Sequence, residues 1–459
     1  MTTEAAALRA VQGTAARPPG ELTDTLAGLM CEGGADAVPD VARECARHAL
    51  LDWACVALAG MREPAVRIVA RLHDPQWEPS VGLVPFTGPS APWAVLVNGT
   101  AGHALDYDDV NSRMHGHPSV PVVPTALAAS ALRGCSGRQL LDAVVLGHEA
   151  EALVGEQFGG AHYANGFHAT GTIGTFGAAA AAAHVLGLTD AQARHALGLA
   201  ATQAAGLKCM FGTMAKPLHA GKAAMNGLWA ARLAQQGFTA AADGIEGAQG
   251  FAATQCTGLR EAPVVSERWA VQDTLYKYHA ACYLTHSAIE ALRALLARTR
   301  LAPEDVERLD VHVPPGHDSV CNIAAPATGL QVKFSLRHLM AMVAHGHDTA
   351  DLDAYTDALA CDADLVRWRE RVQVRFEHLP SAKGARVELH ARGGAVHAHY
   401  SDVGVPREDL PAQWQALVAK GRAVTRGVLA PGRFDALVRC IETLERQPDL
   451  LSLHEAITT

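Results

Sequence analysis

Residues 41–59 read VARECARHALLDWACVALA, and this stretch indicates the class of the fold. Its apolar residues recur every three or four positions, as they do along one face of an α-helix. They are Val41, Cys45, Ala49, Trp53 and Val56. Gly60 follows as a stop signal, so the pattern predicts a helix that ends there.

The helical pattern continues through the first half of the chain. Further helices are predicted over residues 121–132, 139–154, 171–186, 190–205 and 222–236. Thr189 and Asp190 form a start signal for one of them, and Gly237 is a stop signal for another. Several of these segments are dominated by Ala and Gly, and small residues let helices approach closely. The first half therefore predicts a compact bundle of helices.

The pattern changes near residue 270. Apolar and polar residues alternate over 309–313 and 372–376, which predicts strands, and 386–391 and 395–400 flank Arg392-Gly393-Gly394 as a hairpin would. Helical patterns lie between these strands and return after them. They cover residues 335–344, 352–360, 408–419 and 431–445.

We therefore predict a mainly α fold, in which a large all-α helical domain is interrupted by a smaller α+β domain. Residues 1–268 would form the first part of the helical domain, and residues 269–402 the α+β domain. Residues 403–459 would form C-terminal helices that pack back on the helical domain.

Composition excludes several classes of function. The 459 residues are 49% hydrophobic and 19% charged, and the formal net charge is -9, with no basic tract. This argues against a nucleic-acid partner. The longest apolar stretch, residues 176–188, is too short and too weak to span a membrane, and the first 20 residues lack the apolar core of a secretory signal. A cytoplasmic protein is expected.

The ten cysteines are scattered, without a Cys-x-x-Cys pair. This spacing favours neither a structural zinc site nor an iron–sulfur cluster, and in a reducing compartment we expect free thiols.

Ionisable residues gather in Gly- and Pro-rich breaks between the apolar helices, where binding and catalytic residues tend to lie. These breaks are residues 103–109, 113–119, 162–171, 208–222 and 276–286. Lys and His in such positions suit an anionic ligand such as a polycarboxylate, whose charge must be offset on desolvation. Removal of a proton next to a carboxylate builds up charge on its oxygens, so it needs a positioned base and a nearby cation.

Each break also has a plainer interpretation. Three aspartates stand in four positions, Asp106, Asp108 and Asp109, which is typical of a solvated loop or a helix cap. They would also suit Mg²⁺ in a metal-dependent enzyme, although the lysines and histidines of the other breaks would then have no role. His115 and His117 have the spacing of a metal-ligand pair, but no third ligand is fixed by spacing.

Single cations in the later breaks suit structural positions equally well. Lys216 is compatible with a surface loop, Lys277 with a domain boundary, and His286 with a partly buried position at the start of an apolar helix. A non-catalytic protein that binds carboxylates or acts as a scaffold therefore stays an alternative to an enzyme.

Six motifs, taken in order, resemble the signatures of the MmgE/PrpD family. They are HALDYDD at 103–109, GHPS at 116–119, GFH at 166–168, GTMAKPLHAG at 212–221, the segment around Lys277, and QVKFSL at 331–336. The family includes 2-methylcitrate dehydratase, cis-aconitate decarboxylase and iminodisuccinate epimerase. The resemblance implies a helical domain with an α+β lid domain, a homodimer, an active site between the two domains, and no metal or organic cofactor.

The resemblance also implies the site residues. The catalytic set would be Asp106, His117, His168, Lys216 and Lys277. Substrate-binding neighbours would be Arg113, Lys208, His219 and Tyr163.

The chain departs from the family pattern at four positions. Ala169 and Ala280 stand where prolines are usual, and Cys282 and Val320 stand where the decarboxylase branch has a histidine and a tyrosine. The last two departures disfavour a decarboxylase. We therefore expect a cofactor-independent lyase that dehydrates a small hydroxylated di- or tricarboxylate such as 2-methylcitrate. An isomerase or epimerase of a substituted succinate is the alternative.

Overall fold

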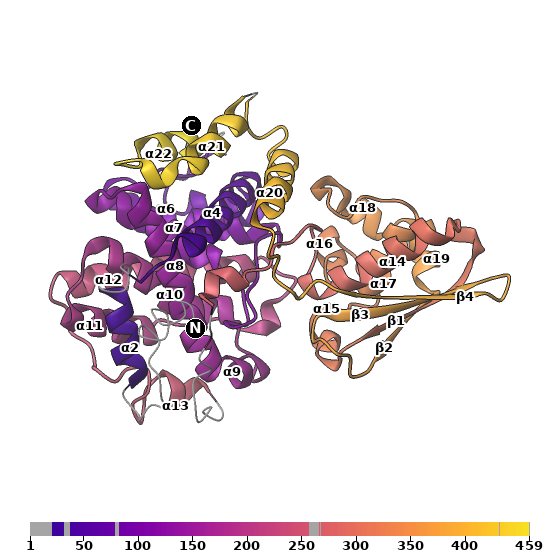
Figure 1. Ribbon diagram of the computed structural model, residues 1–459, viewed down its shortest axis with the longest axis horizontal. Helices are drawn as coiled ribbons and strands as arrows, with labels where there is room; N and C mark the ends of the chain where they lie inside the picture. The colour runs from indigo at the N-terminus through magenta and orange to yellow at the C-terminus, as the bar shows by residue number, and fades with distance from the viewer. Residues whose placement is uncertain are drawn as a thin grey trace. The chain divides into compact units, whose positions relative to one another are not determined.

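The computed structural model describes residues 21–31, 37–78, 82–256, 266, 268–430 and 432–458. It divides into two compact units, and Figure 1 labels the helices and strands of each. The first contains the described residues up to Met210, Met214–Tyr276 and those from Glu408 onward, and the second contains Phe211–Thr213 and Lys277–Arg407.

The main segment of the second unit begins at Lys277, later than the start at residue 269 that the sequence predicts for the α+β domain. Residues 269–276 contact the first unit, because the backbone of Ala270 donates to Glu149 over 2.7 Å and Leu275 forms a β-bridge with Val110.

The first unit is built from helices. Its longer helices are α2 (Glu21–Met30), α4 (Asp40–Gly60), α5 (Pro64–Arg71), α6 (Ala91–Ala104), α7 (Ser119–Arg133), α8 (Gly137–Val154), α10 (Ala169–Leu186), α11 (Asp190–Ala201), α12 (Ala215–Gln235), α20 (Leu410–Val424), α21 (Arg433–Glu442) and α22 (Leu451–Thr458). The mainly α fold that the sequence predicts is confirmed.

Small residues let the central helices approach closely, as the Ala- and Gly-rich segments predict. A Cβ added at Gly221 in α12 would lie 2.3 Å from the carbonyl oxygen of Leu96 in α6, and one at Gly99 would lie 2.9 Å from the Cα of Gly221. The crossing of α6 and α12 therefore requires glycine. Almost all of α10 is buried between its neighbours, including the alanine run 178–183.

Some helix boundaries differ from the predicted ones. The start at Thr189 is confirmed, because its hydroxyl accepts from the backbone of Gln192 in a capping box. However, α12 begins at Ala215 rather than at residue 222, since Gly221 marks a helix crossing and not a helix break. Helix α6 was not predicted, because it is buried on most sides and its sequence shows no apolar stripe at helical spacing.

The second unit contains a four-stranded sheet in the order β2-β1-β3-β4. Its strands are β1 (Val306–Val313), β2 (Val372–Phe376), β3 (Gly384–Ala391) and β4 (Val396–Asp402). β1 pairs parallel to β2 and antiparallel to β3, and β3 and β4 form the predicted hairpin. Helices α14 (His286–Thr299) and α17 (Leu336–Ala344) pack against the sheet (Figure 1).

The helix predicted over 352–360 is wrong as a single element. It is a short 3-10 turn, Leu352–Ala354, followed by α18 (Asp357–Ala360). Thr356 is extended and its hydroxyl accepts from the backbone of Leu359, so it starts a new helix instead of continuing the old one. That the second unit acts as a lid stays a prediction.

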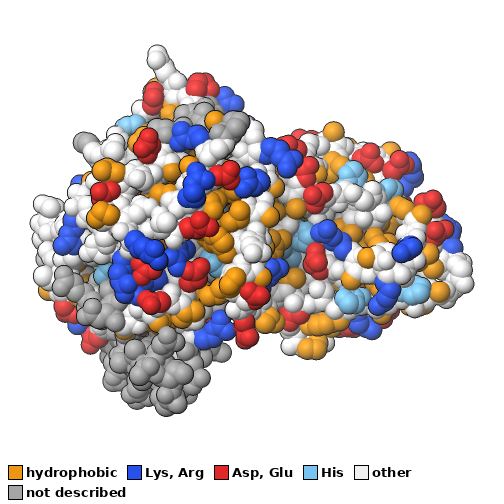
Figure 2. Space-filling view, turned by 45° about the horizontal axis from the view of Figure 1, so that its top comes forward, with side chains coloured by type: hydrophobic (Ala, Val, Ile, Leu, Met, Phe, Trp, Pro, Cys, Tyr) orange, Lys and Arg blue, Asp and Glu red, His pale blue; other side chains and the backbone are white. Residues whose placement is uncertain are grey.

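On the face in Figure 2, basic and acidic side chains lie interspersed. Within the described ranges, no helix has both the length and the apolar character needed to cross a membrane.

Candidate functional site

Four helices of the first unit bring polar side chains to one place. His103 lies in the last turn of α6, His117 lies two residues before α7, His168 is the N-cap of α10, and Lys216 lies in the first turn of α12. Helices α6, α7 and α12 pack against one another, and α10 packs against α7 and α12. The backbone N–H of His117 donates to the hydroxyl of Thr170 over 3.1 Å, which links the starts of α7 and α10.

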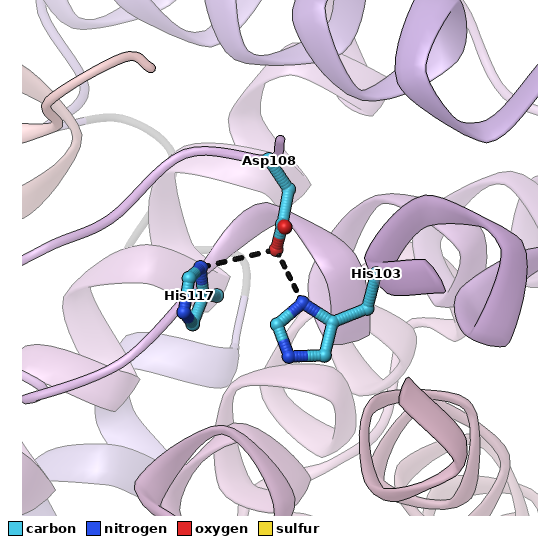
Figure 3. Close-up of side chains that lie close together, drawn as sticks. All are labelled: His103, Asp108 and His117. Atoms are coloured by element: carbon cyan, nitrogen blue, oxygen red, sulfur yellow. Dashed lines mark hydrogen bonds and ion pairs between the residues drawn. The ribbon is translucent and has the colours of Figure 1, made fainter. Parts of the chain in front are cut away.

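Asp108 lies between two of these histidines. Its Oδ2 is 2.7 Å from Nδ1 of His103 and 3.1 Å from Nδ1 of His117, as Figure 3 shows. The Nδ1 atom of His117 also lies 2.8 Å from the carbonyl oxygen of Asp109. Both His103 and Asp108 are buried, whereas the side chain of His117 keeps 13% of its exposure. Of the three residues, His117 is therefore the one that a ligand can reach.

His168 extends this cluster. Its ring stacks on the ring of His103, with centroids 5.7 Å apart, and its Nδ1 lies 3.1 Å from Nδ1 of His219 in α12. One of these two nitrogens donates and the other accepts, so the histidines share a hydrogen bond. His219 therefore contacts His168, and its predicted role in binding the substrate stays a prediction.

Asp106 and Lys216 form a buried ion pair beside the histidines. Asp106 has a φ of 53°, in the left-handed region that few residues other than glycine adopt. This conformation turns the chain directly after α6. Lys216 is 5% exposed, so the interpretation of Lys216 as a surface loop lysine is wrong.

Burial sets the charge of these groups. It lowers the pKa of His103 to about 4 and holds the pKa of His168 well below its ordinary value, with the positive charge of Lys216 acting in the same direction on both. Burial opposes the ionised form of Asp108, but the two histidines that contact it lower its pKa well below the usual range. The cluster therefore combines neutral imidazoles with a carboxylate and an ammonium group.

The three neighbouring aspartates serve different partners. Asp106 pairs with Lys216, Asp108 contacts the two histidines, and Asp109 accepts from the hydroxyl of Ser119 over 2.5 Å. Burial raises the pKa of Asp109 to about 8. This dispersal contradicts a shared Mg²⁺ site made of all three carboxylates.

Two groups of described residues bring three potential metal ligands within 4.8 Å of one another. One is His103, Asp108 and His117, and the other is Asp310, Glu388 and His390 on the sheet. In the first group, Nδ1 of His117 also faces a backbone carbonyl oxygen, so this nitrogen carries a hydrogen and has no lone pair for a metal. In the second, Arg308 and Arg375 already pair with Asp310. Hydrogen bonds and ion pairs therefore explain why the residues of each group lie close together, without a metal ion.

Other predicted residues lie in different surroundings. The guanidinium of Arg113 is surrounded by carboxylates, so we leave this residue out of the proposed site. The carboxylates around Arg113 are those of Glu156 at 2.6 Å, Glu149 at 3.4 Å and Asp273 at 3.6 Å.

Lys208 and Tyr163 contact each other. The ammonium group of Lys208 lies 3.8 Å from the ring centre of Tyr163 and donates a hydrogen bond to the carbonyl oxygen of Tyr163. Lys277 is buried in the second unit, and its role stays a prediction.

The sequence prediction missed His103 and Asp108. Both stand in the HALDYDD motif, five positions apart, and only this spacing hints at their contact. The loop between them contains the left-handed turn at Asp106, which no simple period reveals.

The cluster has the groups that proton transfer next to a carboxylate requires. Imidazoles act as general bases or donate N–H groups, and an ammonium group stabilises charge that develops on carboxylate oxygens. The structure brings His117, His168, Asp106 and Lys216 together, and their catalytic roles stay predictions.

Comparison with known proteins gives matches along most of the chain. A model of the MmgE/PrpD N-terminal domain matches residues 24–263, and a model of the MmgE/PrpD C-terminal domain matches residues 279–444. The chain is 28% identical over 382 residues to cis-aconitate decarboxylase of Homo sapiens, which covers 78% of this chain and 77% of the human protein.

Two fungal proteins give similar matches. Cis-aconitate decarboxylase-like protein oryM of Aspergillus oryzae is 29% identical over 306 residues, or 61% of this chain and 63% of that protein. Cis-aconitate decarboxylase of Aspergillus terreus is 27% identical over 336 residues, or 67% of this chain and 68% of that protein. The two domain models together match more than half of the chain, and it belongs to the MmgE/PrpD family.

Proposed function

We propose that this protein is a lyase of the dehydratase and decarboxylase kind, which acts on a small polycarboxylate without a cofactor. One observation carries the proposal: buried Lys216 and Asp106 lie beside a cluster of neutral histidines at the meeting point of four helices. The relatives named above are cis-aconitate decarboxylases or resemble one, which supports a lyase.

For a dehydratase, the chemistry would proceed through an enolate. An imidazole removes the proton next to a carboxylate, and the electron pair of that C–H bond forms the new double bond. The hydroxyl on the neighbouring carbon leaves and takes a proton from an imidazole N–H, so the products are an alkene and water. Lys216 offsets the charge that builds up on the carboxylate oxygens.

A decarboxylase is the second candidate, and the relatives favour it. There the bond to one carboxylate breaks, its electron pair passes into the conjugated acid, and carbon receives a proton in place of CO₂. Cys282 is buried in the apolar core of the second unit and Val320 packs against that core. These two positions, where the decarboxylase branch carries polar side chains, therefore favour the dehydratase.

Substrate trials separate the two reactions. The purified protein is incubated with 2-methylcitrate, citrate and cis-aconitate, and ultraviolet absorbance follows the conjugated double bond while released CO₂ is trapped. A rising absorbance with 2-methylcitrate identifies a dehydratase, and CO₂ release from cis-aconitate identifies a decarboxylase. No change in absorbance and no release of CO₂ with any of the three acids would contradict the proposal of a lyase.

The other predictions need their own measurements. An epimerase would place solvent deuterium on the α-carbon of a substituted succinate without forming a new double bond. A homodimer would show in solution as twice the mass of 48.2 kDa by light scattering.

A further inference from the structure

We propose that Asp108 is a positioning residue, which fixes the tautomer of His117 and is itself held in place by His103. His117 would then remove the substrate proton through Nε2. This inference rests on the proposed function and assigns the base that the family motifs leave open.

The contacts of His117 determine where its ring proton lies. Nδ1 of His117 is 2.8 Å from the carbonyl oxygen of Asp109 and 3.1 Å from Oδ2 of Asp108. A backbone carbonyl and an ionised carboxylate only accept hydrogen bonds, so Nδ1 must carry the hydrogen. In the neutral ring, Nε2 then carries the lone pair that a base needs.

His103 holds the carboxylate from the other side. Its Nδ1 lies 2.7 Å from the same oxygen of Asp108, and its ring meets that of His117 edge to face, with centroids 4.6 Å apart (Figure 3). His103 is 1% exposed, and burial keeps it neutral. It therefore donates a hydrogen bond to Asp108 without cancelling its charge.

This arrangement prepares His117 to accept a proton. When Nε2 takes the substrate proton, the ring becomes positive, and the carboxylate of Asp108 stabilises that charge at Nδ1. The Asp–His pair of the serine hydrolase triad works by the same physical principle, in which the carboxylate orients the imidazole and stabilises the imidazolium.

The test compares Asp108→Asn with the unaltered protein. We expect kcat to fall by about 10²–10⁴-fold and KM to change only a few-fold, because the amide cannot stabilise the imidazolium. Asp142→Asn is the matched control, since Asp142 is also buried and pairs with Arg43 over 2.6 Å in the helical unit. That variant should keep its kcat even if its stability falls.

Two variants at His103 test the second contact. An asparagine can place its N–H near the position of Nδ1 and preserve the hydrogen bond to Asp108, whereas a leucine cannot. We expect His103→Leu to lower kcat by at least tenfold more than His103→Asn. Equal losses would show that His103 only fills space.

Nuclear magnetic resonance reads the tautomer without an assay of activity. In protein labelled with ¹⁵N-histidine, the signals of His117 are assigned by their loss in His117→Gln. We expect the Nδ1–H tautomer in the unaltered protein and a mixture of tautomers in Asp108→Asn. An Nε2–H tautomer, or no change on substitution, overturns the inference.

Failure of this inference differs from failure of the proposed function. If no polycarboxylate is turned over, the tautomer measurement still decides whether Asp108 positions His117. If turnover is present and Asp108→Asn keeps its kcat, Asp108 is not a positioning residue and the lyase stands. A divalent metal that copurifies at one equivalent and is lost in Asp108→Asn would also overturn the positioning role of Asp108.

Discussion

At the scale of single residues, the ion pair between Asp106 and Lys216 is the most consequential contact. Both side chains are buried, and Asp106 adopts a left-handed backbone conformation to reach the start of α12. Such conformations are costly and persist where the surroundings enforce them. The pair places a positive charge next to the histidines, where a substrate carboxylate would need it.

Removal of that charge should impair catalysis. We expect Lys216→Met to lower kcat/KM for the accepted polycarboxylate by about 10²–10³-fold, which is typical when a group that stabilises developing charge is lost. Steady-state kinetics checks this. Lys222→Met is the control, because Lys222 lies on the same helix and is exposed, so its activity should stay within twofold. A Lys216→Met protein as active as this control would remove Lys216 from the site.

The sequence predicts this part of the site well, but not all of it. Asp106 and His117 lie between helices, and His168 and Lys216 lie at the starts of α10 and α12, where the residue types themselves indicate anion chemistry. The partners of the three aspartates are set by the turn at Asp106 and by the bridge between Asn111 and Gly116. Such loop geometry has no periodic signature, so Asp108 could not be distinguished from its neighbours.

At the scale of secondary-structure elements, the crossing of α6 and α12 positions the site. The two helices carry His103 and Lys216, and a side chain at Gly221 would meet the carbonyl oxygen of Leu96 at 2.3 Å. We expect Gly221→Ala to lower the free energy of unfolding by about 1–3 kcal/mol, as overpacking of a tight interface does. Denaturant unfolding monitored by circular dichroism measures this.

A second glycine supplies the control. Gly28 in α2 is exposed, and a Cβ added there meets nothing within 4 Å. Gly28→Ala should therefore raise the stability by about 0.5–1 kcal/mol, because alanine has the lower entropy cost in a helix. If Gly221→Ala were equally stabilising, the close crossing would be wrong.

Elements with a clear period could be predicted from the sequence, and elements without one could not. The spacing of apolar residues predicts α4 almost to its ends, and alternation predicts β2 at its exact residues. Helix α6 is buried on most sides, so its sequence carries no contrast between faces. The sequence predicts a helix that begins only at residue 222, whereas Gly221 lies inside α12, because a glycine at a crossing and one at a helix end look alike in sequence.

At the scale of the whole molecule, buried histidines should make folding sensitive to acid. Burial lowers the pKa of His148 to about 3. The unfolded chain takes up a proton near pH 6.5 and the folded chain does not, so the stabilisation is complete above pH 6.5 and is lost as pH falls toward 3.

The substitution His148→Gln isolates this effect. The stability difference between the unaltered protein and this variant should shrink by about 1.4 kcal/mol for each pH unit below 6.5. Denaturant unfolding from pH 7 to pH 5 measures it. A constant difference for His148→Gln would mean that this histidine titrates normally in the folded protein.

The family and the mainly α fold follow from motifs and periods spread along the chain, but the reaction does not. Dehydration, decarboxylation and epimerisation all pass through charge next to a carboxylate, so the same imidazoles and ammonium group serve each of them. The side chains that choose between these reactions act through their placement around the substrate, which no sequence period describes.

Proton magnetic resonance of 2-methylcitrate and cis-aconitate incubated with the protein, beside His168→Ala, tests the lyase most directly. We predict that one acid is converted to an alkene product by loss of water or CO₂, and that His168→Ala slows this conversion at least a hundredfold. Unchanged spectra of both acids, or equal conversion by the variant, would contradict lyase chemistry at this histidine cluster.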